Sequence, residues 1–298
     1  DNPLLFFGCG NMGGAMLEGW IAGGIDPAAF IVVDPMAQSL PIGVMHFADA
    51  SQVDVKVSIA LAAVKPQIFA QISGQLESVL TDDALLLSVM AGVRVEALQS
   101  ALPGRAIVRL MPNLAAALGK SPLGLVESDG NAALRAEIET LLSPLGTPVW
   151  ISEEPLMDAV TALAGSGPAF VYRYIDALAK AGEALGLDPE VSATLAKTMV
   201  DGAVDLAVGS DTSPEELARR VTSPGGTTAA GLSVLDAGLQ QLVTDTLKAA
   251  RDRGVKRFHL AIPALDFVIG GDEALQTTAQ FGAQFFFGRQ DQAVLAGK

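Results

Sequence analysis

Short runs of consecutive hydrophobic residues alternate with stretches of helical periodicity over the first half of the chain. Such runs are typical of strands that are buried on both faces of a parallel sheet. We predict strands at residues 4–7, 30–33, 57–64, 85–89, 106–110, 123–126 and 148–151, with a helix near 132–142 between the last two. The alternation of strand and helix predicts a doubly wound α/β domain over residues 1–152.

From Pro155 onward the hydrophobic period becomes that of helices. We predict helices at 157–163, 169–185, 191–208 and 239–253, with another that begins at Ser213-Pro214-Glu215-Glu216. Many small Ala and Gly residues permit close helix crossings. The pattern predicts an all-α domain over residues 153–254 that serves dimerisation and forms one wall of an active site.

Residues 255–298 form a C-terminal extension of unknown role. Its density of Phe residues, at Phe281 and Phe285–Phe287, favours an ordered apolar segment. A docking element at a subunit interface and a fusion artefact both remain open for it.

A glycine-rich turn follows the first predicted strand directly, with the sequence Phe7-Gly8-Cys9-Gly10-Asn11-Met12-Gly13. Strand, glycines, helix, strand and a terminal acid in this order indicate a Rossmann-type dinucleotide site. The acid is Asp34, 21 positions after Gly13. Its carboxylate could accept hydrogen bonds from ribose hydroxyls and would repel a 2′-phosphate, which predicts a preference for NADH over NADPH.

Polar groups and turns follow two further predicted strands. Ala63-Val64-Lys65-Pro66 ends one strand, and Met111-Pro112-Asn113 ends another. Ligands bind beyond the carboxyl ends of strands in such sheets. A break at Gly165-Ser166-Gly167-Pro168 interrupts the first helices of the second half. It fits a packing kink and an opened backbone facing the cofactor equally well.

The stretch Ser223-Pro224-Gly225-Gly226-Thr227-Thr228 opens onto an apolar helical pattern. A helix that begins after two glycines presents unpaired N–H groups, which suits a small anion. The hydroxyls of Thr227 and Thr228 add donors and acceptors beside it. The alternative is an ordinary turn in which a Thr caps the helix.

Composition narrows the classes of partner. Half of the residues are hydrophobic and 17% are charged, which is typical of a well-buried globular protein. The net charge of −14 argues against nucleic acid and against docking on anionic membranes. The single cysteine, the absence of a visible signal segment and the lack of a long apolar run predict a cytoplasmic protein. We expect no metal site.

The five motifs together resemble the pyrroline-5-carboxylate reductases, the last enzymes of proline biosynthesis. They are Gly8–Gly13, Ala63–Pro66, Met111–Asn113, Gly165–Ala169 and Ser223–Thr228, in the family's order and at about its spacing. The resemblance covers roughly residues 4–254. It implies hydride transfer from NAD(P)H to the C=N bond of 1-pyrroline-5-carboxylate, giving L-proline. It also implies self-association into at least a dimer, with a larger decamer-type assembly as an alternative.

The same resemblance assigns roles to residues. The cofactor would lie on Phe7–Met12 and near Ala63–Pro66, with Asn113 beside it. The substrate carboxylate would bind the backbone N–H groups around Gly225, Gly226, Thr227 and Thr228, and the Thr228 hydroxyl would bond the ring nitrogen. Asp211 falls where the family often has an acidic residue of the substrate loop.

The chain departs from the family pattern at two places. Ala50 and Ser51 stand where an Asn is usual, and Leu114-Ala115 replaces the usual Thr-Pro. Two other functions compete. A β-hydroxyacid-type dehydrogenase would need a basic catalytic residue on the first long helix of the second domain; Lys180 and Lys197 are present, but neither follows a recognisable motif. A non-catalytic dinucleotide-binding protein would keep the fold alone.

Overall fold

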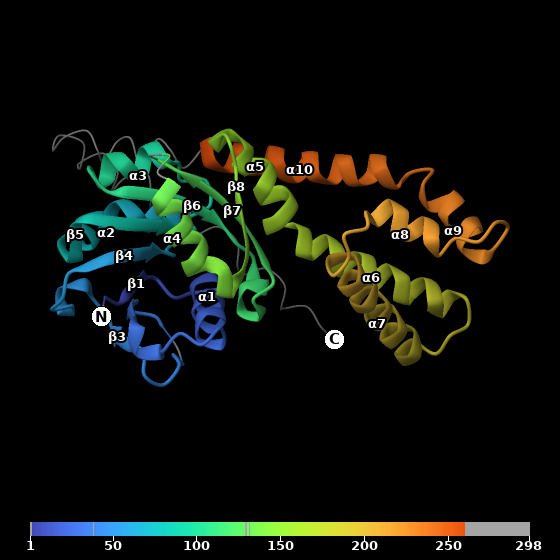
Figure 1. Cartoon of the computed structure of the whole chain (residues 1–298), viewed down its shortest axis with the longest axis horizontal. Coiled ribbons are helices and arrows are strands. Elements are labelled where there is room, and N and C mark those ends of the chain that lie inside the picture. Colours follow the sequence, from blue (N-terminus) through green and yellow to red (C-terminus); the bar gives the residue numbers. More distant parts are fainter. Residues whose placement is uncertain (1, 38, 129, 131, 260–298) are drawn as a thin grey trace, which may run out of the picture.

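The computed structural model describes residues 2–37, 39–128, 130 and 132–259 (Figure 1). A sheet with helices on both faces forms one part, and an arm of helices extends from it. The last helix of the arm returns along the molecule to the sheet part. The predicted extension 255–298 therefore lies outside the described residues, apart from the last residues of that helix.

The sheet has eight strands in the order β3-β2-β1-β4-β5-β6-β7-β8. Their bounds are β1 Leu4–Phe7, β2 Phe30–Val33, β3 Met45–Phe47, β4 Val57–Ala62, β5 Leu80–Ser88, β6 Ala106–Met111, β7 Ser121–Glu127 and β8 Gly146–Trp150. The predicted α/β fold is confirmed. The order reverses between β1 and β4, and ligands bind beyond the strand ends at such a switch point.

One pair of strands departs from the predicted parallel sheet, because β7 runs antiparallel to β6. The connection between them, residues 112–120, is shorter than the dozen or more residues that a parallel crossover requires. The edge strand β3 is a second difference. Its side chains are exposed or half-buried, so it lacks the buried hydrophobic run by which the other strands are recognised.

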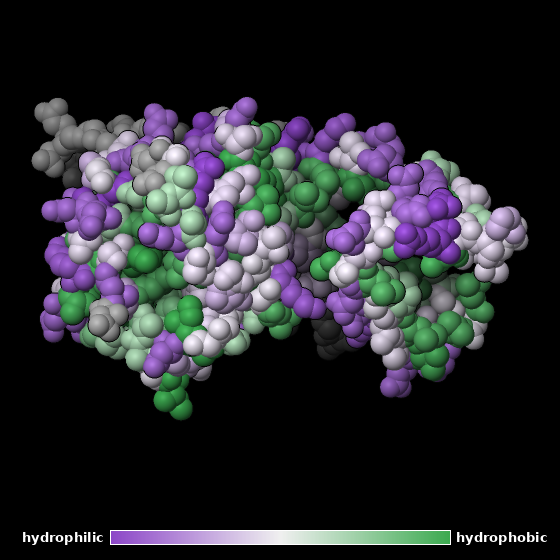
Figure 2. All heavy atoms as spheres, in the orientation of Figure 1, coloured by the Kyte–Doolittle hydropathy of each residue, from purple (hydrophilic) through white to green (hydrophobic). Residues whose placement is uncertain are grey.

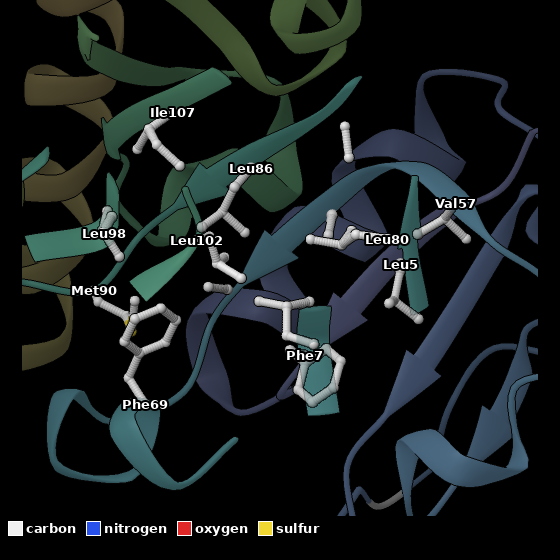
Figure 3. Packing of buried hydrophobic residues seen from close by; sticks show 14 of the residues in the cluster. Leu5, Phe7, Val57, Phe69, Leu80, Leu86, Met90, Leu98, Leu102 and Ile107 are labelled. Atoms are coloured by element: carbon white, nitrogen blue, oxygen red, sulfur yellow. The ribbon is translucent and has the colours of Figure 1, made fainter. Parts of the chain in front are cut away.

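Helices cover both faces of the sheet, and alternate strand residues serve opposite faces. Leu5, Phe7 and Leu86 pack against α2 (Pro66–Val79) and α3 (Val95–Ala101), as Figure 3 shows. On the other face Phe6 meets Trp20 of α1 (Asn11–Ala22), with ring centroids 5.7 Å apart. The helix α4 (Ala132–Leu142) covers the same face. One cluster of buried hydrophobic side chains thus packs on each face of the sheet.

The arm is helical, as predicted. Its helices are α5 Met157–Val160, a π-helical turn Thr161–Gly165, α6 Gly167–Ala184, α7 Pro189–Val208, α8 Pro214–Arg220, α9 Thr227–Leu235 and α10 Leu239–His259. Short 3-10 helices occur at Pro27–Ala29, Ala50–Gln52, Leu114–Leu118, Ser143–Leu145 and Glu154–Leu156. In the arm α6 packs on α7, and α10 packs on α5 and the π-helical turn (Figure 1). Among the described residues, no helix combines the length and apolarity needed to cross a membrane.

The arm leaves large hydrophobic side chains exposed, and Figure 2 shows hydrophobic patches on it. They include Val171, Tyr172, Leu185, Leu195, Met199, Leu206 and Val208. Contiguous exposed apolar surface of this kind marks an interaction site in soluble proteins. The arm thus carries surface that a second protein chain can bury.

Candidate active site

The turn between β1 and α1 is shaped by two glycines. Gly8 has φ +88°, and a Cβ there would lie 2.8 Å from the Ala63 carbonyl oxygen. A Cβ at Gly13 would lie 2.9 Å from the Gly8 carbonyl oxygen. Gly10 is the N-cap of α1, and no side chain caps this helix. The first amides of α1 are therefore available to an anion, as a dinucleotide pyrophosphate requires.

Asp34 is tied to this turn from the end of β2. Its Oδ2 accepts a 2.7 Å hydrogen bond from the Cys9 N–H, and its Oδ1 accepts one of 2.8 Å from Met36 N–H. The carboxylate is thus fixed beside the glycine turn. The chain has no Lys or Arg before Lys56, so the first β–α–β unit offers neither residue to a 2′-phosphate, and the His46 Nε2 lies 2.9 Å from the Asp34 carbonyl oxygen.

The loop after β4 lies beside the β1–α1 turn and is the third part of the predicted cofactor site. Ala63 N–H donates to the Phe7 carbonyl oxygen at 2.8 Å. Lys65, which is exposed, is the N-cap of α2 and is followed by Pro66, again without a side-chain cap. The structure therefore brings Gly8–Gly13, Asp34 and Ala63–Pro66 together at the switch point. Phe7 itself is a buried core residue, so it can take part only through its backbone.

Burial dominates the chemistry of the only cysteine. Desolvation, with smaller contributions from the Asp34 and Glu18 carboxylates, raises the pKa of Cys9 to about 11. The thiol is therefore neutral at physiological pH. A neutral thiol is a poor nucleophile, which excludes Cys9 as the carrier of covalent chemistry.

Asn113 lies at the end of β6 and is buried. Its Oδ1 accepts from the Ala115 N–H at 2.9 Å, and its Nδ2 donates to the Ala164 carbonyl oxygen at 3.0 Å. Both ends of the side chain are thus used within the protein. The residue reaches the predicted edge of the sheet, but its amide faces the arm.

The start of α9, like the starts of α1 and α2, has no side-chain cap. Gly226 is its N-cap without a side-chain cap, and Thr227 and Thr228 are its first two residues. Gly225 has φ +69°, which favours glycine, and Gly226 N–H donates to the Ser223 carbonyl oxygen at 3.0 Å. The alternative in which a Thr caps this helix is therefore wrong. Exposed amides and hydroxyls stand together here.

Within one chain the two predicted half-sites are apart. Figure 1 shows α8 and α9 at the far end of the arm, away from the β1–α1 turn. Asp211 precedes α8, and Gly225 follows it, so the two lie at opposite ends of a helix of about 10 Å. The structure does not bring the substrate residues to the cofactor residues of the same chain.

The lysines required by the dehydrogenase alternative lie elsewhere. Lys180 is near the distal end of α6, where its Nζ donates to Asp176 at 2.9 Å on the exposed surface. Lys197 is exposed on α7. Neither lies at the carboxyl edge of the sheet, where a proton-transferring base would be needed.

Comparison with known proteins decides between the alternatives. Residues 154–256 match the family model described as pyrroline-5-carboxylate reductase dimerisation, and residues 3–92 match NADP oxidoreductase coenzyme F420-dependent. A pyrroline-5-carboxylate reductase from Pseudomonas aeruginosa is 34% identical over 261 residues, covering 85% of this chain and 96% of that protein. The chain belongs to the pyrroline-5-carboxylate reductase family.

Solved structures of pyrroline-5-carboxylate reductases agree with this family. That from Coxiella burnetii has a TM-score of 0.79 at 30% identity, covering 86% of this chain and 98% of its own. That from Plasmodium falciparum, solved with NADP bound, has a TM-score of 0.74 at 26% identity, covering 85% and 97%. One family departure is visible in the structure: Leu114, where Thr is usual, is 57% exposed beside Asn113.

Proposed function

We propose that this protein reduces 1-pyrroline-5-carboxylate to L-proline with NAD(P)H, the last step of proline biosynthesis. The observation that carries the proposal is two helix starts with a glycine N-cap and no side-chain cap, Gly10 of α1 and Gly226 of α9, in a chain of this reductase family. That of α1 suits a dinucleotide pyrophosphate, and that of α9 suits a small carboxylate. The dehydrogenase alternative lacks a base at the sheet edge, since Lys180 and Lys197 lie on arm helices, and a protein that only binds dinucleotide has no use for the α9 end.

The substrate has two features that the α9 end matches, an acid group and an imine nitrogen. The N–H groups of Thr227 and Thr228 hold the carboxylate, since that of Gly226 already donates to the Ser223 carbonyl oxygen, and the Thr228 hydroxyl bonds the ring nitrogen. The reduced nicotinamide supplies the hydride for the imine carbon. A protonated imine is already electrophilic, so these residues need only orient the ring. Asp211 borders the same loop and is a weaker candidate for contact.

Asp34 favours NADH over NADPH. Its carboxylate is held by the Cys9 and Met36 amides, so it cannot swing away from an arriving 2′-phosphate. No Lys or Arg precedes Lys56, so the first β–α–β unit supplies that phosphate with neither residue.

The active site forms between two chains. The separation of α9 from the cofactor turn within one chain, and the exposed apolar surface of the arm, support this arrangement.

The domain boundary falls at residue 152, between β8 and the first turn of the arm. A decamer-type assembly is the alternative to a dimer, and a mass measurement in solution separates them. The net charge of −14 argues against nucleic acid and anionic membranes as binding partners. We also propose that the protein is cytoplasmic.

The test is consumption of NADH and of NADPH, in parallel, with and without pyrroline-5-carboxylate. The expected result is imine-dependent oxidation of NADH with formation of proline. Oxidation of a 3-hydroxy acid instead would favour the dehydrogenase, and cofactor binding without turnover would favour a non-catalytic protein. At an NADH concentration below the Kd of the Gly10→Ala protein, both Gly10→Ala and Thr228→Ala proteins should be impaired, and mixing them should give more activity than their sum if the site spans two chains.

A further inference from the structure

The π-helical turn Thr161–Gly165 belongs to the first helices of the arm and contacts β6 of the sheet part. Ser166 N–H donates to the Thr161 carbonyl oxygen, five residues earlier, at 2.9 Å. The Thr161 hydroxyl donates to the Met157 carbonyl oxygen of α5 at 2.7 Å. Turns of this type are rare, and they concentrate at functional sites.

A proline removes one hydrogen-bond donor from this turn. The carbonyl of Ala164 would accept from the amide of residue 168 in an α-helix, but that residue is Pro168, which has no N–H. The Ala169 N–H is used elsewhere, since it donates to the Ser166 carbonyl oxygen at 3.1 Å. The group that donates to Ala164 is the Asn113 Nδ2, at 3.0 Å, from a position 51 residues away.

The Oδ1 and the backbone N–H of Asn113 form hydrogen bonds within the sheet part. Its Oδ1 accepts from the Ala115 N–H, and its own N–H donates to the Ser121 Oγ at 2.9 Å. The side-chain amide of a buried residue, anchored by its Oδ1 and by its backbone N–H, thus supplies the missing donor to the turn. The Met111 side chain lies beside the same turn, since a Cβ added at Gly165 would be 3.5 Å from the Met111 sulfur.

We infer that Asn113 is a positioning residue that replaces the missing Pro168 amide, fixes the π-helical turn, and so sets the direction of the arm. The extra residue of a π turn rotates everything after it by about 100° relative to a continuous α-helix. The arm carries Gly226–Thr228 to the partner's cofactor, so this rotation decides whether substrate and cofactor meet. The role replaces the direct cofactor contact predicted for Asn113, and it rests on the proposed function.

Two substitutions separate the roles. Asn113→Ser keeps an N-capping oxygen for Ala115 but is too short to reach Ala164. Pro168→Ala returns an N–H to the position from which Ala164 can accept. We expect Asn113→Ser to lower kcat/KM for pyrroline-5-carboxylate about tenfold or more, with the Kd for NADH within about twofold of wild type. The double variant should recover most of the loss, and Pro168→Ala alone is the control.

Hydrogen exchange gives a readout that does not depend on turnover. The amides of residues 163–169 should exchange about tenfold faster in Asn113→Ser and return towards wild type in the double variant. If wild type fails to reduce the imine, the proposed function fails while exchange and NADH affinity still test Asn113. Weaker NADH binding without rescue by Pro168→Ala would make Asn113 a cofactor contact instead, and wild-type behaviour of Asn113→Ser would overturn the inference as well.

Discussion

Gly10 offers a way to remove cofactor binding without disturbing the fold. Its φ of −72° is open to any residue, and a Cβ added there meets no atom within 4 Å. Because Gly10 is the N-cap of α1, where Gly is preferred over Ala, Gly10→Ala is expected to lower the free energy of unfolding by about 1 kcal/mol, which leaves the protein folded. The same methyl group would stand where a pyrophosphate approaches the backbone at the start of α1.

The expected loss follows from the contacts that the methyl displaces. A hydrogen bond from an amide to a charged group contributes about 1.5–3 kcal/mol. Losing one such bond weakens NADH binding by about 10- to 150-fold, since 1.36 kcal/mol corresponds to a factor of ten. A larger loss is expected if the methyl also displaces the neighbouring amide.

Gly14 supplies the matched control, because it lies in the same helix and its added Cβ also meets nothing within 4 Å. Both variants are compared with wild type by thermal unfolding without cofactor and by titration of NADH fluorescence. Gly14→Ala should retain NADH affinity and be slightly more stable, because Ala favours a helix over Gly. A folded Gly10→Ala protein that binds NADH as wild type does would refute the placement of the pyrophosphate.

Four further predictions concern other parts of the molecule. Glu154→Ala strands the Arg109 guanidinium, whose side chain is 6% exposed and 2.7 Å from Glu154, and should cost about 3 kcal/mol in thermal unfolding, with exposed Glu153→Ala as the neutral control. Alkylation of Cys9 by iodoacetamide should accelerate about tenfold per pH unit from pH 8 to 10, because its pKa of about 11 keeps the thiolate scarce below that pH; a plateau near pH 8 contradicts this. Asp34→Ser should raise the NADPH/NADH ratio of kcat/KM by about tenfold or more, and an unchanged ratio removes Asp34 from cofactor choice. Thr228→Ala should lower kcat/KM for the imine by about 5- to 150-fold at unchanged NADH affinity, and full activity would exclude a bond from its hydroxyl.

The fold could be predicted from the sequence where buried elements are marked by a pattern of hydrophobic residues. The strands at 4–7 and 30–33 are hydrophobic throughout because both their faces are covered, and the structure places them as β1 and β2. Met45–Phe47 lies at the sheet edge with one side in solvent, so no such pattern marks β3. The antiparallel direction of β7 depends on the length of one connection, which is known only after both strand ends are fixed.

The candidate site divides in the same way. Parallel strands deliver their following loops to one edge, so the meeting of Gly8, Asp34 and Ala63 follows from topology. The bond from Asn113 to Ala164 spans 51 residues and depends on a proline missing its amide, which no local pattern reveals. The sequence alone indicates only that Pro168 leaves the carbonyl oxygen of Ala164 without its usual hydrogen-bond donor. The distance of α9 from the cofactor turn likewise depends on how the arm packs.

The most direct test of the account follows the transferred hydrogen. Wild-type protein is mixed with NADH deuterated at both C4 positions and with pyrroline-5-carboxylate, and the proline formed is analysed by mass spectrometry and NMR. The account predicts one deuterium per proline, on the ring carbon that was double-bonded to nitrogen. Proline without deuterium, or imine left unreduced by a protein that binds NADH, would contradict it.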